Sequence, residues 1–383
     1  MNVIVIPGMP RIAGRRYHIA KTLAEQGHNV HYLVWDLPYR LGFSQIITHL
    51  RTTLLAKEYP YEGFTVHKIR RLPFFWPYIN GWLFKYQLRK LNNSVKADFI
   101  FSQSYTNETE VPKDLPLIYD LNDDNVAMAE VYGSLIYKLA FRILRVRTVI
   151  RRQCQNALAV TAVSEATYAI GKQYNKRVFK LANGVDTKVI KEVINSKSTY
   201  PKNKFSIVYV TGFNQWSRPI ETMQVVMKLR KEFPSIELAL IGEGTETKKI
   251  EEFIKGNKVE NYIHYLGGIY NRKKLFSLIN QSTIGLNISE KNKYRDAAQP
   301  IKIFEYSALG KKIVSTDLEE VKILDFPNVF IFSDNTGSNN LLNAMRLALK
   351  DDSTYEDISS RVIANYDWVK LSRELVTIFK ESI

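Results

Sequence analysis

The sequence predicts two α/β domains, each built on a doubly wound parallel sheet of the Rossmann type. Its 383 residues exceed the length of one compact domain. A buried strand, a glycine-containing loop, a helix and a second strand open the chain, and the same pattern starts again near residue 206. The stretch between them, residues 187–204, is rich in Lys, Asn and Ser, as an exposed connection is.

The first βαβ pattern lies within the first 35 residues. The apolar run Val3–Ile6 ends at Pro7-Gly8 and predicts a strand. Ile19, Ala20, Leu23 and Ala24 form one face of a helix that Gly27 ends, and Val30–Val34 predicts the next strand.

The second pattern uses the same signals. Ser206–Val210 predicts a strand, a helix follows through Met223–Lys231, and Glu237–Ile241 predicts a strand that runs into Gly242. The tail 366–383 has Trp368, Leu371, Leu375 and Ile378 at helical spacing. The expected parts are a domain at 1–186, a linker at 187–204, a domain at 205–364 and a C-terminal helix at 365–383.

Composition narrows the class of protein. The apolar fraction is 45% and the charged fraction 24%, which excludes a disordered or low-complexity chain. A single cysteine, Cys154, excludes an intramolecular disulfide framework and fits a reducing cytosol. The net charge is +16, and residues 1–185 carry 25 basic against 13 acidic residues. This asymmetry suggests an acidic partner at one face, either nucleic acid or anionic lipid headgroups, and the alternative is a solvated basic surface.

Four segments follow predicted strands and could present N–H groups to phosphates. Neither a P-loop nor a full GxGxxG is present, which disfavours simple ATPases and ordinary NAD dehydrogenases. Taken singly, each glycine could also be an ordinary turn residue. The segments are 8–16, 211–219, 242–245 and 299–316.

Residues 299–316, QPIKIFEYSALGKKIVST, form the most specific segment. Pro300 begins a helix, with Lys302 and Glu305 near its N-terminal end. A carboxylate there can accept two ribose hydroxyls while Lys302 faces a diphosphate. The alternative is a capping glutamate beside a solvated lysine.

This segment resembles the nucleotide-sugar signature of GT-B glycosyltransferases of the group 1 and family 4 type. Further landmarks occur in the order that family shows, namely YDLNDDN at 119–125, TAVSEATYAI at 161–170 and LANGVDT at 181–187. The resemblance implies two domains facing across a cleft and a C-terminal helix that crosses back to the N-terminal domain. It also implies a nucleotide-sugar donor bound without a cofactor.

The same resemblance assigns roles. Glu305 would bind the donor ribose, Arg218 and Lys302 the diphosphate, and Gly242, Glu243 and Gly244 would lie against the base. The other expected donor-binding residues are Gly8, Arg15, Arg16, Gly212, Ser217 and Ile303.

The chemistry of transfer calls for further groups. If the anomeric centre is inverted, a carboxylate must deprotonate the acceptor, and Asp120, Asp123 and Asp124 are the candidates. If it is retained, no strong base is needed. No Asp-x-Asp occurs, so we expect no metal requirement.

Two basic, aromatic stretches without acidic residues, 68–90 and 131–152, predict contact with an anionic membrane and a lipid-linked or membrane-embedded acceptor. The alternative is a core helix with a basic edge. With no long apolar run, we expect a cytoplasmic chain, peripheral on the inner face of the membrane. The expected membrane or acceptor residues are Arg70, Arg71, Trp76, Trp82, Arg142 and Arg145.

Rival functions remain open from the residues alone. One is another enzyme with two such domains, such as a sugar-nucleotide epimerase. Another is a basic nucleic-acid-binding protein, although no recognised binding motif occurs and we expect no nucleic-acid partner.

Overall fold

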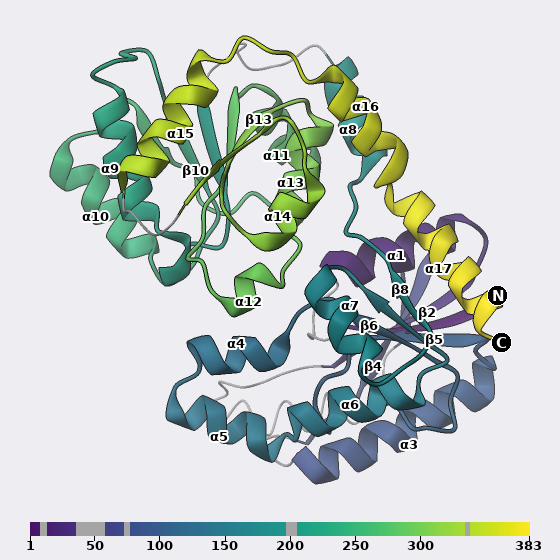
Figure 1. Cartoon of the computed structure of the whole chain (residues 1–383). Helices are drawn as coiled ribbons and strands as arrows, with labels where there is room; N and C mark the ends of the chain where they lie inside the picture. Colours follow the sequence, from purple (N-terminus) through teal and green to yellow (C-terminus); the bar gives the residue numbers. More distant parts are fainter. Residues whose placement is uncertain (8–13, 36–57, 73–76, 197–204, 334–337) are drawn as a thin grey trace. The chain divides into compact units, whose positions relative to one another are not determined.

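The computed structural model of the chain describes residues 1–7, 14–35, 58–72, 77–196, 205–333 and 338–383. They form two compact units: the first contains Met1–Ala182 and Trp368–Ile383, and the second contains Asn183–Asp367. Each unit has one parallel or mainly parallel sheet between layers of helices (Figure 1). The predicted fold class, two doubly wound α/β domains, is confirmed.

The sheet of the first unit has the strand order β3-β4-β2-β1-β5-β6-β7-β8 among the described residues. Its neighbouring strands are parallel, except that β3 pairs antiparallel with β4 at the edge. The strands are β1 Asn2–Ile6, β2 Asn29–Trp35, β3 Glu58–Tyr61, β4 Phe64–Ile69, β5 Phe99–Ser102, β6 Leu117–Leu121, β7 Ala159–Ala162 and β8 Val178–Lys180.

Helices cover both faces of this sheet, so apolar residues on both faces dominate its central strands. Val3 and Val5 of β1 pack in the core on the side of α1, whereas Ile4 and Ile6 pack on the side of α3 and α6. The helices are α1 Gly14–Glu25, α3 Pro77–Val95, α4 Asn125–Tyr132, α5 Leu135–Ile143, α6 Val146–Asn156, α7 Glu165–Lys172 and α17 Trp368–Ser382.

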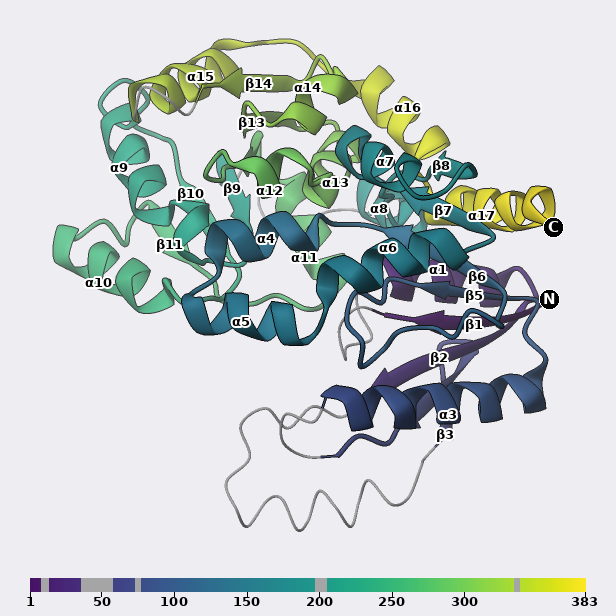
Figure 2. The same ribbon diagram turned by 60° about the horizontal axis from the view of Figure 1, so that its bottom comes forward.

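The C-terminal helix α17 belongs to the first unit and packs on α1 (Figures 1 and 2). The rings of His18 and Trp368 stack with centroids 5.2 Å apart, and Gln26 Nε2 donates to Ser372 Oγ at 2.6 Å. The predicted return of this helix to the N-terminal domain is confirmed. Its apolar stripe, including Leu375, completes the core on the α1 side of the sheet.

The sheet of the second unit has the order β11-β10-β9-β12-β13-β14, and its paired strands are parallel. Helices α9, α10 and α15 cover one face, and α8, α11, α13 and α16 cover the other. The strands are β9 Ile207–Val210, β10 Leu238–Ile241, β11 Ile263–Tyr265, β12 Ile284–Asn287, β13 Lys312–Thr316 and β14 Val329–Phe332. The helices are α8 Thr187–Asn195, α9 Pro219–Leu229, α10 Thr247–Asn257, α11 Arg272–Asn280, α12 Lys293–Asp296, α13 Ile301–Ala308, α14 Glu319–Leu324, α15 Ser338–Lys350 and α16 Glu356–Asn365, with a 3-10 turn at Gln215–Ser217.

The expected linker at 187–204 is wrong over its first half. Thr187–Asn195 forms helix α8 of the second unit, and Ile190 and Val193 are buried in its core. The division between the units falls after Ala182, not after residue 186. The Lys- and Asn-rich composition of this stretch suggested an exposed connection, although the apolar Ile190 and Val193 lie at helical spacing. Residues 197–204 lie outside the described part of the chain.

Candidate active site

The loops after β9 and β10 in the second unit lie backbone against backbone. Phe213 N donates to Glu243 O at 3.1 Å, and Glu246 N donates to Phe213 O at 2.9 Å. A Cβ on Gly242 would lie 1.8 Å from Thr211 O, and one on Gly244 would lie 2.1 Å from Phe213 O. Both glycines are therefore required for the two strand ends to meet. Gly212 shows no such crowding.

Glu243 holds the neighbouring loop after β11. Its carboxylate accepts from Gly268 N and from the Tyr270 hydroxyl, each at 3.3 Å. Tyr270 is 84% exposed, so its ring stands free beside the strand ends. A flat, exposed ring at this edge could stack on a base.

Arg218 occupies the junction between the β9 loop and α9. It has a left-handed backbone with φ 50°, directly before Pro219, and its Nε donates to Glu221 Oε2 at 2.6 Å. The preceding Ser217 is buried, and its hydroxyl donates to Asn214 O at 2.6 Å. Ser217 therefore shapes the turn, whereas the guanidinium of Arg218 remains partly exposed.

Glu305 lies on α13 and is 7% exposed. Its Oε1 accepts a hydrogen bond from Arg272 Nη2 of α11, whose guanidinium carbon lies 4.4 Å from the Phe276 ring centroid. Sequence reasoning missed Arg272, because no motif marks it. The neighbouring Ile303 is fully buried in the hydrophobic core, so its side chain cannot contact a donor, contrary to expectation.

Lys302 lies one turn before Glu305 on the same helix, with Nζ 5.4 Å from the Tyr209 ring centroid. The pKa of Lys302 is lowered to about 7, mainly by burial and also by the positive charge of Arg295, while the negative charge of Glu305 opposes both. The Tyr209 hydroxyl lies 2.6 Å from Ser217 O, next to Arg218. Lys302, Arg218 and Arg295 thus gather around one tyrosine. Arg295 is a second residue that sequence reasoning missed.

In the first unit, Arg15 and Asp120 form a buried ion pair. Arg15 Nε lies 3.1 Å from Asp120 Oδ2, and the remaining guanidinium nitrogens donate to the carbonyls of Leu181 and Ala182. Asp120 also accepts from Thr161 Oγ1 at 2.8 Å and has 0% exposure. These contacts differ from two expectations: Arg15 is 1% exposed and is held by a carboxylate and two carbonyls in place of a phosphate, and Asp120 is closed to an acceptor hydroxyl.

The other two carboxylates differ from Asp120. Asp124 caps α4 by accepting from Val126 N and Ala127 N at 3.1 and 2.9 Å. Asp123 is half-buried and accepts from Asn122 Nδ2 at 2.9 Å. Asp124 therefore has a structural role as a helix cap, and Asp123 is left as the candidate base.

Arg16 is 8% exposed, and its Nε and Nη1 have no hydrogen-bond acceptor among the residues described. Burial lowers the pKa of its guanidinium, and the charge of Asp120, 3.9 Å away, opposes this. Buried guanidinium donors without an acceptor suit an anionic ligand. Gly8 lies outside the described residues.

The expected membrane or acceptor residues differ in how far they are exposed. Arg71 pairs with Glu108 at 2.6 Å, and its side chain is 10% exposed. It therefore cannot reach a lipid headgroup, contrary to the expectation. Trp82 is 67% exposed and stacks on Tyr86 with centroids 6.0 Å apart. Arg70 is exposed, and Trp76 lies outside the described residues.

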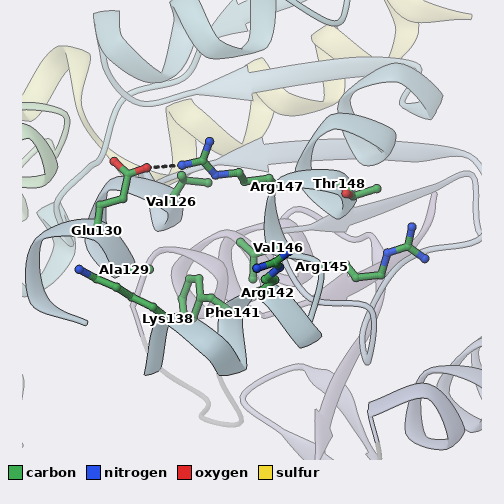
Figure 3. Close-up of a pocket in the computed structure, with 10 residues that line it drawn as sticks. All are labelled: Val126, Ala129, Glu130, Lys138, Phe141, Arg142, Arg145, Val146, Arg147 and Thr148. Atoms are coloured by element: carbon green, nitrogen blue, oxygen red, sulfur yellow. Dashed lines mark hydrogen bonds and ion pairs between the residues drawn. The ribbon is translucent and has the colours of Figure 1, made fainter. Parts of the chain in front are cut away.

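Arg142 and Arg145 are exposed and line a cavity of about 480 Å³ between α4, α5 and α6 (Figure 3). Helix α5, which forms one wall of this cavity, has no buried residue, and its Leu135 and Ile136 are 87% and 82% exposed. Within the described ranges, no helix combines the length and apolarity needed to cross a bilayer. The same residues contain no His, Cys, Asp and Glu grouping suited to a metal ion.

Two family models match adjacent parts of the chain. Glycosyltransferase family 4 matches residues 16–189, and glycosyl transferases group 1 matches residues 190–364. Among curated proteins, no match is found.

Solved structures of glycosyltransferases share this fold. HepE from Anabaena, in complex with UDP, is 14% identical with a TM-score of 0.68, over 100% of both chains. A glycosyltransferase from Rickettsia africae is 16% identical with a TM-score of 0.65, over 100% of this chain and 98% of that one. WaaG, a glycosyltransferase involved in lipopolysaccharide biosynthesis, is 13% identical with a TM-score of 0.63, over 98% and 94%.

At these identities the solved structures establish the fold, while the two family models, which together span residues 16–364, establish the family. The motifs at 119–125, 161–170 and 299–316 all lie within that span. The chain belongs to the group 1 glycosyltransferases of the GT-B fold.

Proposed function

We propose that this glycosyltransferase moves a sugar from a nucleotide-diphosphate sugar to a lipid-linked or cell-surface glycan acceptor at the membrane surface, without a metal ion. The observation that carries the donor part is the pairing of Lys302 and Glu305 on α13, beside the joined ends of β9 and β10. Parallel α/β sheets bind ligands outside the carboxyl ends of their strands.

The two side chains suit the two halves of a nucleotide. The buried carboxylate of Glu305 accepts one hydrogen bond from Arg272, and its second oxygen can accept from ribose hydroxyls. Lys302 and Arg218 supply positive charge for a diphosphate. The complex of HepE with UDP supports a donor of this class.

Transfer breaks the bond between the anomeric carbon and the diphosphate oxygen, and the electron pair leaves with the nucleoside diphosphate. Lys302 and Arg218 lower the barrier by stabilising the charge that develops on that oxygen. For an inverting reaction, Asp123 would take the acceptor proton. For a retaining reaction, no base of this kind is required.

The acceptor part rests on the surface of the first unit. The exposed side chains of Leu135, Ile136 and Leu139 on α5, together with Trp82 on α3, are apolar, and basic residues flank them. Helices of this composition bind at the headgroup level of anionic bilayers. The enzyme and a membrane-bound acceptor would then lie at the same bilayer surface.

A thermal-shift panel of UDP-, GDP-, ADP- and dTDP-sugars tests the donor part. A ligand at about 100 times its dissociation constant stabilises a protein by about 2.7 kcal/mol. We expect one nucleotide sugar to raise the melting temperature of the native chain and to lose this effect in Glu305→Gln.

Glu251→Ala, an exposed glutamate of α10, is the matched control and should respond as the native chain does. A panel without any shift, or equal shifts in native chain and Glu305→Gln, would remove the donor assignment. Binding of single-stranded nucleic acid in place of all four donors would favour the alternative class.

A further inference from the structure

The cavity between α4, α5 and α6 lies in the first unit and contains none of the donor-binding residues. Its volume is about 480 Å³, and four basic side chains and one acidic side chain line it (Figure 3). The acid, Glu130, pairs with one of those bases, Arg147. The charge that remains at the cavity is therefore positive.

Three cations of the lining have no counter-charge from the part of the chain that the structure describes. No carboxylate of the described residues lies within ion-pair distance of Lys138, Arg142 or Arg145. All three side chains are exposed, and all lie within eight residues of chain at α5 and the start of α6. Positive charge gathered along this short stretch of chain attracts an anionic ligand.

The N-terminus of α6 adds backbone donors to the same cavity. Val146, Arg147 and Thr148 are the first residues of this 11-residue helix and line the cavity. Their backbone N–H groups have no acceptor among the described residues, and Arg145 at the N-cap provides no side-chain cap. Free N–H groups and the helix dipole both favour an anion at this place.

The rest of the lining is apolar. Phe141, Val126, Ala129 and Val146 form this part of the wall, and the Phe141 ring packs on Tyr137 with centroids 4.6 Å apart. Figure 3 shows Phe141 beside Lys138, so apolar and basic groups alternate along α5. A free phosphate would leave this wall in contact with water, whereas a phosphate that carries an apolar group would cover it.

We propose that this cavity binds a phosphate or diphosphate group with an attached apolar chain. The phosphate oxygens accept from the N–H groups of α6 and from Lys138 and Arg142, and the chain lies against Phe141. Within the proposed function, on which this part of the inference rests, the ligand is the phosphate-linked lipid end of the acceptor. The exposed apolar face of α5, with Leu135 and Ile136, then lies on the bilayer that holds the lipid.

Isothermal titration of the full chain with n-decyl phosphate, below its micelle concentration, tests the cavity. The comparison ligands are n-decyl maltoside, which has the chain without the phosphate, and inorganic phosphate, which has no chain. We expect decyl phosphate to bind at least about tenfold more tightly than either, because only it uses both the cations and the apolar wall.

The double variant Lys138→Gln, Arg142→Gln should weaken decyl phosphate binding by at least about tenfold. The double variant Arg151→Gln, Lys176→Gln also removes two exposed charges of the first unit, outside the cavity, and should bind as the native chain does. Equal affinity in the two double variants would overturn the inference. Inorganic phosphate that binds as tightly as decyl phosphate would overturn the role of the apolar wall.

Donor binding separates this inference from the proposed function. The Lys138, Arg142 variant should keep the thermal shift with the nucleotide sugar, and Glu305→Gln should keep the affinity for decyl phosphate. If no nucleotide sugar binds but the cavity variants behave as stated, the function fails and the phosphate site stands. If the donor binds but decyl phosphate does not, the site fails alone.

Discussion

Arg272 on α11 donates a hydrogen bond to Glu305 on α13, and no other side chain of the described residues donates to this carboxylate. Because hydrogen bonds to charged groups contribute about 1.5–3 kcal/mol, we expect Arg272→Gln to release Glu305 and to lower donor affinity about tenfold. Titration with the donor measures this. Lys274→Gln removes one exposed charge from the same helix and should leave the affinity unchanged. Equal losses in both variants would mean that the charge of α11 matters and the orientation of Glu305 does not.

Donor binding should depend on pH through Lys302. Because burial lowers the pKa of Lys302 to about 7, this side chain is charged below that pH and loses its charge above it. We expect donor affinity to fall as the pH rises from about 6 to 9. Lys302→Arg keeps the charge throughout, so its affinity should vary much less across the same range. A native profile as flat as that of the arginine variant would contradict the role given to Lys302.

The lowered pKa of Lys302 should also make the free energy of unfolding of the ligand-free protein depend on pH. A lysine with a lowered pKa binds fewer protons in the folded state than in the unfolded state between pH 7 and its usual value near 10.4. The free energy of unfolding contributed by this group therefore rises with pH across that window. Urea titrations of the native chain and Lys302→Met at pH 7 and 9 measure this. Their difference should shift in favour of the native chain at the higher pH.

Asp120 and Asp124 should act on stability to different degrees. Asp120→Ala removes the carboxylate that pairs with the buried Arg15, and the loss of one member of a buried pair costs about 3–5 kcal/mol. Asp124→Ala removes a helix cap, which costs about 1 kcal/mol. Urea denaturation compares the two. A loss for Asp120→Ala no greater than that for Asp124→Ala would show that the Arg15 pair is not a stabilising contact.

Gly242 should resist substitution. In Gly242→Ala the new Cβ would lie 1.8 Å from Thr211 O, on a backbone with φ 136°, so the β9 and β10 loops must separate. We expect loss of donor binding and a lower melting temperature. Gly256→Ala is the control, since nothing lies within 4 Å of its Cβ and it falls within α10. This change should stabilise the protein by up to about 1 kcal/mol.

The exposed face of α5 should control binding to vesicles. Leu135→Glu and Ile136→Glu together place two negative charges on an apolar surface, and we expect sedimentation with phosphatidylglycerol vesicles to fall to the level seen with phosphatidylcholine. Leu347→Glu, 61% exposed in the second unit, is the control and should bind as before. Binding of the native chain that does not depend on lipid charge would contradict the membrane part of the proposed function.

Local patterns were enough to predict most of the fold. The strands at Val3–Ile6 and Ser206–Val210 and the helices that follow them appear within a few residues of their expected ends, because continuous apolar runs and helical spacing are properties of short segments. Helix α8 was missed for the same reason. Its two buried apolar positions are too few to stand out in a stretch of lysines and asparagines.

By itself the sequence determined the fold class, the family motifs and the helix that carries Lys302 and Glu305, since each depends on residues that lie close together along the chain. The tertiary structure decided which polar side chains meet. Arg15 and Asp120 are 105 residues apart, and Arg272 and Glu305 are 33 apart, so only the folded backbone brings each pair within hydrogen-bond distance. The same packing buries Asp120 and leaves Asp123 partly exposed. The two residues belong to one sequence motif, so the motif alone does not distinguish their burial.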